Sequence, residues 1–109
     1  MQKELRVYRT KEGKEPFTEW LNSFKDKVVK AQIANRLHRL ALGHYGDYHA
    51  VGSGVHELRI HYGAGYRIYF VEHEKTVVLL LIGGSKSTQK KDIQKAIKCW
   101  LEFRERCYD

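Results

Sequence analysis

The chain has 109 residues, which fits one domain with one modest core, and we expect a single domain over residues 1–109. Its formal net charge of +7 favours a polyanionic partner, either nucleic acid or an acidic protein. The apolar share of 42% is ordinary for a folded domain and argues against disorder. The N-terminus is polar and no apolar run reaches membrane-spanning length, so we expect a cytoplasmic protein without a signal peptide.

The N-terminal part of the chain predicts a strand and then a helix. Apolar and polar residues alternate over residues 4–9, the pattern of a half-buried strand. Pro16, the only proline, suits the first position of a helix, because its missing N–H is no loss there. Apolar side chains then follow at helical spacing: Phe17, Trp20, Leu21 and Phe24.

A second helix is predicted directly after the first. Asp26 can cap its N-terminus, and Gly43 can end it. Its inward positions are Val29, Ile33, Leu37 and Leu40. We expect a glycine-rich loop over residues 43–54, with His49 among its polar side chains.

The C-terminal part predicts a central strand and a final helix. Residues 77–82 are apolar at every position, which favours a strand covered on both faces. Residues 83–88 should break this strand, and their backbone N–H groups, with Lys86 among them, suit an anion. The final helix is expected from about Thr88 to Arg106. Its buried side is Ile93, Ala96, Ile97, Trp100 and Phe103 or Arg104.

Between these parts lies the most informative segment, a predicted hairpin with arms over residues 55–62 and 66–72. Both arms alternate with period two. Their apolar residues share one face if Tyr62 lies opposite Tyr66, and a three-residue loop that ends in Gly65 allows this pairing.

The opposite face of this hairpin would carry the polar residues. The predicted register pairs His61 with Arg67 and Arg59 with Tyr69, which leaves the two arginines diagonal, roughly 7–8 Å apart at the backbone. Two like charges held side by side on rigid strands favour the binding of an anionic ligand. The simpler interpretation is that the arginines are solvated or form ion pairs, with Glu57 and Glu72 as the nearest carboxylates.

These residue types match what RNA cleavage needs. A base must remove the proton of the 2′-hydroxyl, positive charge must stabilise the transition state, and an acid must protonate the leaving oxygen. Arg59 and Arg67 can supply the charge, and His61 can act as acid or base. Lys86 or Tyr69 could carry a second proton or contact the RNA. The other candidate RNA contacts are His49, Lys90 and Lys91.

We expect neither a cofactor nor a metal. The spacing of cysteines and histidines resembles no zinc motif. The glycine spacing of a P-loop is missing before Lys86, which argues against ATP binding. Cys99 and Cys107 lie eight residues apart on the predicted final helix, about 12 Å, too far for a disulfide within that helix.

Several segments together resemble the RelE/ParE superfamily of bacterial toxins, in particular its HigB-like branch of addiction-module killer proteins. The resemblance runs nearly end to end. It is carried by Gly54-Val55-His56-Glu57-Leu58-Arg59-Ile60, Gly65-Tyr66-Arg67-Ile68-Tyr69-Phe70, Leu79-Leu80-Leu81-Ile82-Gly83-Gly84, Ser85-Lys86-Ser87-Thr88-Gln89 and Asp92-Ile93.

The resemblance implies the toxin of a type II toxin–antitoxin system with a RelE-like α+β fold. The expected order is β-α-α-β-β-β-α, with a small antiparallel-rich four-stranded sheet. Many such toxins cut mRNA on the ribosome without a metal and so inhibit translation. Arg67 matches the arginine of the superfamily's Gly-x-Tyr-Arg motif, Arg59 that of its Glu-Leu-Arg motif, and Lys86 the basic residue after the last strand. Branch members often carry Gly-Gly-Asp-Lys where this chain has Gly84-Ser85-Lys86, and a lysine where His49 stands.

Two other functions stay open at this point. A ParE-type toxin would poison DNA gyrase by protein contact and would need no acid–base residues. An inactive chain would only bind its antitoxin. In each case we expect an acidic cognate antitoxin that covers the basic face, with charge complementarity speeding association.

Overall fold

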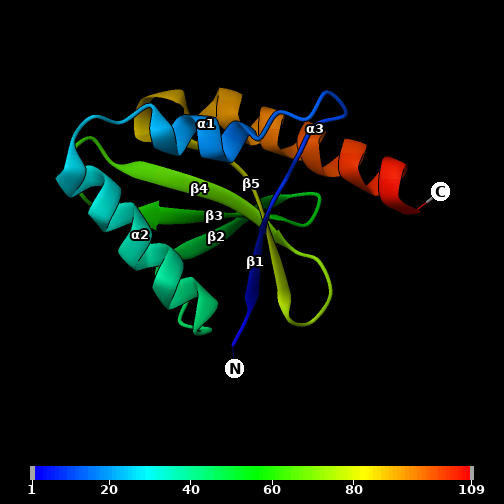
Figure 1. Ribbon diagram of the computed structural model, residues 1–109, viewed down its shortest axis with the longest axis horizontal. Helices are drawn as coiled ribbons and strands as arrows, with labels where there is room; N and C mark the ends of the chain where they lie inside the picture. The colour runs from blue at the N-terminus through cyan, green and yellow to red at the C-terminus, as the bar shows by residue number, and fades with distance from the viewer. Residues whose placement is uncertain (1, 109) are drawn as a thin grey trace.

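In the computed structural model, residues 2–108 are described, and they form three helices and a five-stranded sheet (Figure 1). Chain order places three elements before the long loop: β1 (Glu4–Val7), α1 (Pro16–Asn22) and α2 (Lys27–Ala41). Four strands follow: β2 (Tyr48–Gly52), β3 (Val55–Ile60), β4 (Tyr66–Glu72) and β5 (Val77–Ser85). A short 3-10 helix, η1 (Lys86–Thr88), leads into α3 (Gln89–Tyr108).

The sheet has the order β1-β5-β4-β3-β2 and is mixed. Strand β1 runs parallel to β5, and the other neighbouring strands are antiparallel. The predicted α+β class is confirmed, but the predicted four-stranded sheet is wrong, because the expected glycine-rich loop contains the additional strand β2. Tyr48, His49 and Ala50 of β2 are all exposed, so no apolar alternation marked this strand in the sequence.

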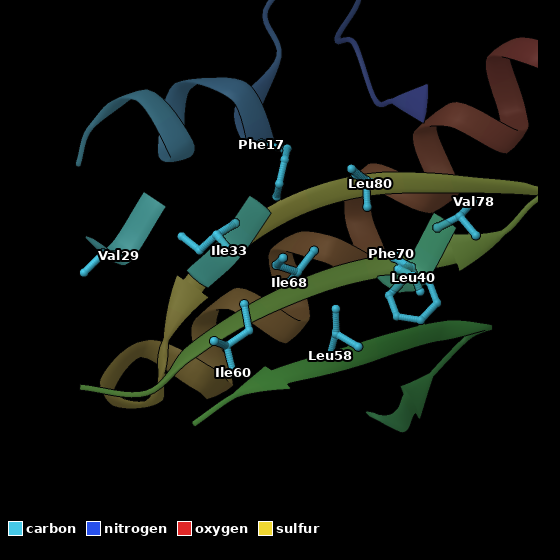
Figure 2. Packing of buried hydrophobic residues seen from close by; sticks show 10 residues of the cluster. All are labelled: Phe17, Val29, Ile33, Leu40, Leu58, Ile60, Ile68, Phe70, Val78 and Leu80. Carbon is cyan, nitrogen blue, oxygen red and sulfur yellow. The ribbon is translucent and has the colours of Figure 1, made fainter. Parts of the chain in front are cut away.

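Helices α1 and α2 cover one face of the sheet, and α3 covers part of the other (Figure 1). Figure 2 shows the first core, in which side chains of the sheet pack against those of the two helices. Its buried members are Phe17, Val29, Ile33, Leu40, Leu58, Ile60, Ile68, Phe70, Val78 and Leu80. The second core, under α3, contains Tyr8, Val55, Tyr69, Val71, Leu79, Leu81, Ile82 and Ala96. Strand β5 contributes to both cores, as its unbroken apolar run predicted.

The helix boundaries follow from the residues that the sequence marked. Pro16 is the first residue of α1. The side chain of Asp26 accepts hydrogen bonds from the backbone N–H groups of Val28 (2.8 Å) and Val29 (3.4 Å), and so caps α2. Gly43, at φ +88°, follows the end of α2 in the left-handed conformation that glycine adopts without strain. No helix in residues 2–108 is long and apolar enough to cross a membrane.

The β3–β4 hairpin has a different register from the predicted one. Ile60, not Tyr62, lies opposite Tyr66, and the loop spans five residues, 61–65. Within it the backbone N–H of Gly65 bonds to the carbonyl oxygen of Tyr62 at 3.0 Å, so Tyr62 belongs to the turn. Because the register differs by two residues, the side chains that remain in the two strands stay on their predicted faces, whereas His61 and Tyr62 leave the strand. The shift nevertheless places Arg59 directly opposite Arg67.

Strand β5 extends through Gly83 and Gly84, where the sequence predicted a break. Both glycines let a helix approach the sheet. A β-carbon on Gly83 would overlap the Trp20 ring of α1, and one on Gly84 would overlap the Asp92 carboxylate of α3. The glycines therefore serve close packing on the strand.

The packing at Gly83 predicts a stability defect for Gly83→Ala. The Trp20 ring is held between Phe17 (centroids 5.8 Å apart) and Phe24 (5.1 Å), so it has little freedom to give way to a methyl group. We expect the free energy of unfolding to fall by about 1–3 kcal/mol, measured by urea denaturation. Lys75→Ala, at an exposed turn position, is the control and should change it by less than about 0.5 kcal/mol. Equal stability of Gly83→Ala and the parent would contradict this packing.

Candidate functional site

A group of polar side chains occupies the α3 face of the sheet, at the end of the sheet near the N-terminus of that helix. The strand register places them on one face, because His49 lies opposite Glu57, Glu57 opposite Tyr69, and Arg59 opposite Arg67. Further along the same face, the apolar side of α3 packs on β4 and β5. The polar group therefore lies beside the part of the sheet on which the apolar side of α3 packs.

Glu57 is the centre of this group, and its side chain is fully buried. Its Oε1 atom accepts hydrogen bonds from Nε of Arg59 (2.9 Å) and from a terminal nitrogen of Arg67 (2.7 Å). Its Oε2 atom accepts from the hydroxyl of Tyr69 (3.0 Å) and from the side-chain amide of Gln89 (3.0 Å). One carboxylate thus connects β3, β4 and the first residue of α3.

The partners of Glu57 keep it ionised. Burial acts to raise the pKa of this carboxyl, but the hydrogen bonds from Arg59, Tyr69 and Gln89 and the charge of Arg67 outweigh it, so the pKa lies below its ordinary value. The hydroxyl of Tyr69 is correspondingly held protonated, because burial and the bond to Glu57 raise its pKa. Both effects stabilise the arrangement at neutral pH.

The two arginines differ in how open they are. The Arg67 side chain is only 11% exposed, whereas that of Arg59 is 33% exposed. Arg59 uses its Nε atom on Glu57, and its terminal nitrogens have no hydrogen-bond partner among the described residues. The hydrogen bond to Glu57 raises the pKa of Arg59 further, so it stays charged. Of the pair, Arg59 is the more accessible to a ligand, whereas Arg67 is nearly buried and binds the same carboxylate.

A second polar group borders Arg59. The Asp47 carboxylate lies 2.8 Å from Nε2 of His49 and 2.6 Å from Nε2 of His61. The backbone N–H of Arg59 donates to the carbonyl oxygen of Asp47 at 2.9 Å, which fixes Asp47 to β3. Arg36 of α2 reinforces this loop, because it donates to the carbonyl oxygens of Arg59 (2.5 Å) and Tyr45 (2.9 Å). His61, predicted on a strand, lies just after β3 and is exposed.

The remaining predicted site residues lie at different depths. Lys86, Lys90 and Lys91 are exposed and line a shallow hollow with Ser87, Thr88 and Gln89. Gln89 also bonds to Glu57, so this hollow adjoins the arginine pair. Tyr69, by contrast, is fully buried and its hydroxyl binds Glu57, so in this structure it supports the site from within and has no surface to offer RNA.

Several backbone N–H groups of the anion site predicted over residues 83–88 have partners within the protein. The N–H groups of Gly83 and Gly84 belong to strand β5, and that of Lys86 donates to the carbonyl oxygen of Gly65 at 2.9 Å. The N–H of Ser85 is engaged by the hydroxyl of Thr88 at 3.4 Å. The exposed positive charge around these residues comes from the side chains of Lys86, Lys90 and Lys91.

Three residues of the site were not singled out for it by the sequence. Glu57 was considered as an ion-pair partner and as part of a family motif, Gln89 only as part of such a motif, and Asp47 not at all. The role of Gln89 can be recognised only once the start of α3 is known to lie against Glu57 of β3. Asp47 depends on strand β2, which the sequence pattern did not reveal. Among residues 2–108, no three His, Cys, Asp or Glu side chains are arranged to hold a metal ion.

Similarity to known families shows which family the chain belongs to. Residues 19–100 match the family model described as Phage derived protein Gp49-like (DUF891). The chain belongs to this family. The Gp49-like family is a toxin-like family of the RelE/HigB type, and its membership implies an antitoxin partner. An uncharacterized protein of Haemophilus influenzae is 46% identical over 80 residues, a match that covers 73% of this Gp49-like chain and 81% of that protein.

The carboxylate at the centre of the site predicts a pH-dependent loss of stability. Because the pKa of Glu57 is lowered in the folded protein, its contribution is fully present above its ordinary pKa of 4.5 and is lost as the pH falls through the lower folded value. In Glu57→Gln the buried Arg67 loses its counter-charge, so we expect the free energy of unfolding at pH 7 to fall by about 3 kcal/mol. Urea denaturation at several pH values measures both effects.

The matched control for this prediction is Glu12→Gln, at an exposed turn position. It should keep the stability of the parent at pH 7 and the same decline in acid. Glu57→Gln should lose less stability than the parent between pH 6 and pH 3, because the group that titrates is gone. A variant as stable as the parent at pH 7 would show that Glu57 does not hold the arginines.

Proposed function

We propose that this Gp49-like protein is the toxin of a type II toxin–antitoxin pair and acts as an endoribonuclease that cuts mRNA, in association with the ribosome. Its toxicity then follows from inhibited translation. The toxin-like character of the family supports the first part of the proposal. The composition of the polar site supports the second part.

The observation that carries the ribonuclease proposal is the exposed Arg59 on β3, near a carboxylate that contacts His49 of β2 and His61 of the loop after β3. Cleavage begins when a base takes the proton of the 2′-hydroxyl and its oxygen bonds to phosphorus. The bond from phosphorus to the 5′-oxygen then breaks, and an acid protonates that oxygen. In this proposal Arg59 stabilises the charge that accumulates on phosphorus, and His61 and His49, which both contact Asp47, carry the protons.

Glu57 limits this charge but does not cancel it. Two guanidinium groups share a single carboxylate, so the group retains a net positive charge. Lys86, Lys90 and Lys91 add exposed positive charge on the adjoining hollow. A phosphate chain that entered along these lysines would reach the exposed end of Arg59 without displacing Arg67 from Glu57.

The ion pairs of Glu57 are also compatible with a second function. If the ion pairs with Glu57 are the whole purpose of Arg59 and Arg67, the face would serve protein binding, as in a toxin that inhibits DNA gyrase. A supercoiling assay with purified gyrase separates the two functions, because a ribonuclease leaves supercoiling unchanged. Full inhibition of supercoiling, with mRNA left intact at toxic doses, would replace our proposal by this one.

Arg59 is the residue whose loss tests the proposed reaction. For Arg59→Ala we expect cleavage of a translated mRNA, followed by primer extension, to fall about 10²- to 10³-fold, since one preorganised charge at the transition state is lost. Arg59→Lys keeps the charge but loses the planar fork, so it should recover only part of the activity. Growth arrest after induction should weaken in the same order.

The control for Arg59 is Arg39→Ala, an exposed position on α2 away from the polar site. It should cleave like the parent. Thermal unfolding of all three variants verifies that they fold. Unchanged cleavage by Arg59→Ala, or intact mRNA during growth arrest by the parent, would refute the proposed mechanism.

A further inference from the structure

Asp47 lies between the loop that follows α2 and the start of β2, and it joins two histidines that are far apart in the sequence. One oxygen of its carboxylate contacts His49 on β2, and the other contacts His61 after β3. Its backbone is tied to Arg59. A single carboxylate thus holds two imidazole rings, on a residue whose backbone is hydrogen-bonded to Arg59.

We propose that Asp47 is the positioning residue for proton transfer in this site: it holds His49 and His61 by their Nε2 atoms and leaves both Nδ1 atoms to the substrate. This inference rests on the proposed ribonuclease function, and it assigns positioning to Asp47 and proton transfer to the two histidines. Asp47 touches no reacting atom, and it acts through the two rings.

The hydrogen-bond chemistry fixes which ring nitrogen is available. The bonds from His61 and His49 lower the pKa of Asp47, so its carboxylate is ionised at neutral pH and can only accept hydrogen bonds. Each Nε2 atom that contacts it must therefore carry a hydrogen. In a neutral ring the lone pair then resides on Nδ1, and neither Nδ1 atom has a hydrogen-bond partner among the described residues.

Two rings held in this way can exchange protons with one phosphodiester. The neutral ring takes the 2′-hydroxyl proton on its Nδ1 atom as the 2′-oxygen bonds to phosphorus. The other ring enters as imidazolium and gives its Nδ1 proton to the 5′-oxygen as the bond from that oxygen to phosphorus breaks. The products are a 2′,3′-cyclic phosphate and a free 5′-hydroxyl, and exchange with water restores the two rings.

The surrounding charges explain why a carboxylate is needed here. Arg59 on β3 and Arg36 on α2 are the cations that interact electrostatically with Asp47, and Glu57 is occupied by Arg59 and Arg67 on the adjoining part of β3 and β4. The carboxylate of Asp47 is the negative group that contacts both rings, so it can stabilise whichever ring carries positive charge during the reaction.

The test compares Asp47→Asn, Asp47→Glu and the control His44→Gln, which alters an exposed histidine of the same loop outside the site. The substrate is an mRNA fragment on programmed ribosomes, and single-turnover cleavage is followed from pH 5 to pH 9. We expect Asp47→Asn to cleave about 10²-fold more slowly and the limbs of its pH profile to move to lower pH, because the charged ring is less stabilised. Asp47→Glu should recover part of the rate, and His44→Gln all of it.

A second readout separates positioning from binding. The same fragment with a 2′-deoxynucleotide at the cleavage position cannot react, and Asp47→Asn should bind it as tightly as the parent does. Equal weakening of binding and cleavage would overturn the inference, and so would an unchanged rate and pH profile in Asp47→Asn. If the parent cleaves no mRNA, the proposed function fails and this inference fails with it, whereas an Asp47→Asn variant with full activity refutes the inference alone.

Discussion

The polar site depends on one constraint, a fully buried carboxylate between two arginines that lie directly opposite each other on neighbouring strands. Opposed residues of an antiparallel pair have β-carbons about 4.5–5.5 Å apart, so Arg59 and Arg67 would repel without Glu57. Because Glu57 is not exposed to water, both of its carboxylate oxygens require hydrogen-bond partners within the protein. The site and the junction of β3, β4 and α3 are therefore one structure, and a change in either affects the other.

The same constraint gives the two arginines different roles. Arg67 is nearly buried and belongs to the support of the site, whereas Arg59 keeps its terminal nitrogens open. We therefore expect Arg67 to act mainly through its ion pair with Glu57. Mutational loss of function at Arg67 alone would consequently say little about chemistry, and Arg59 is the more informative position.

Much of the fold could be predicted because local signals were strong. Pro16 and the Asp26 cap placed the starts of α1 and α2, and the apolar run over residues 77–82 placed most of β5. Strand β2 was missed because its side chains are exposed, so burial left no alternation for the sequence to show. The hairpin register was off by two residues because two glycines in the loop allow more than one turn, and the choice of turn depends on packing of the strands it joins.

The sequence by itself determined that Arg59, Arg67 and Tyr69 share one face of the hairpin, because alternation with period two is preserved by any even change of register. It also placed the lysines after the last strand on the surface. Only the tertiary structure decided that Glu57 sits under both arginines, that Gln89 reaches it from α3, and that Asp47 holds His49 and His61. The contacts of Glu57 with Arg67 and Gln89 and of Asp47 with His61 join residues 10 to 32 positions apart in the chain, and their geometry follows from strand order and helix packing, which no local pattern encodes.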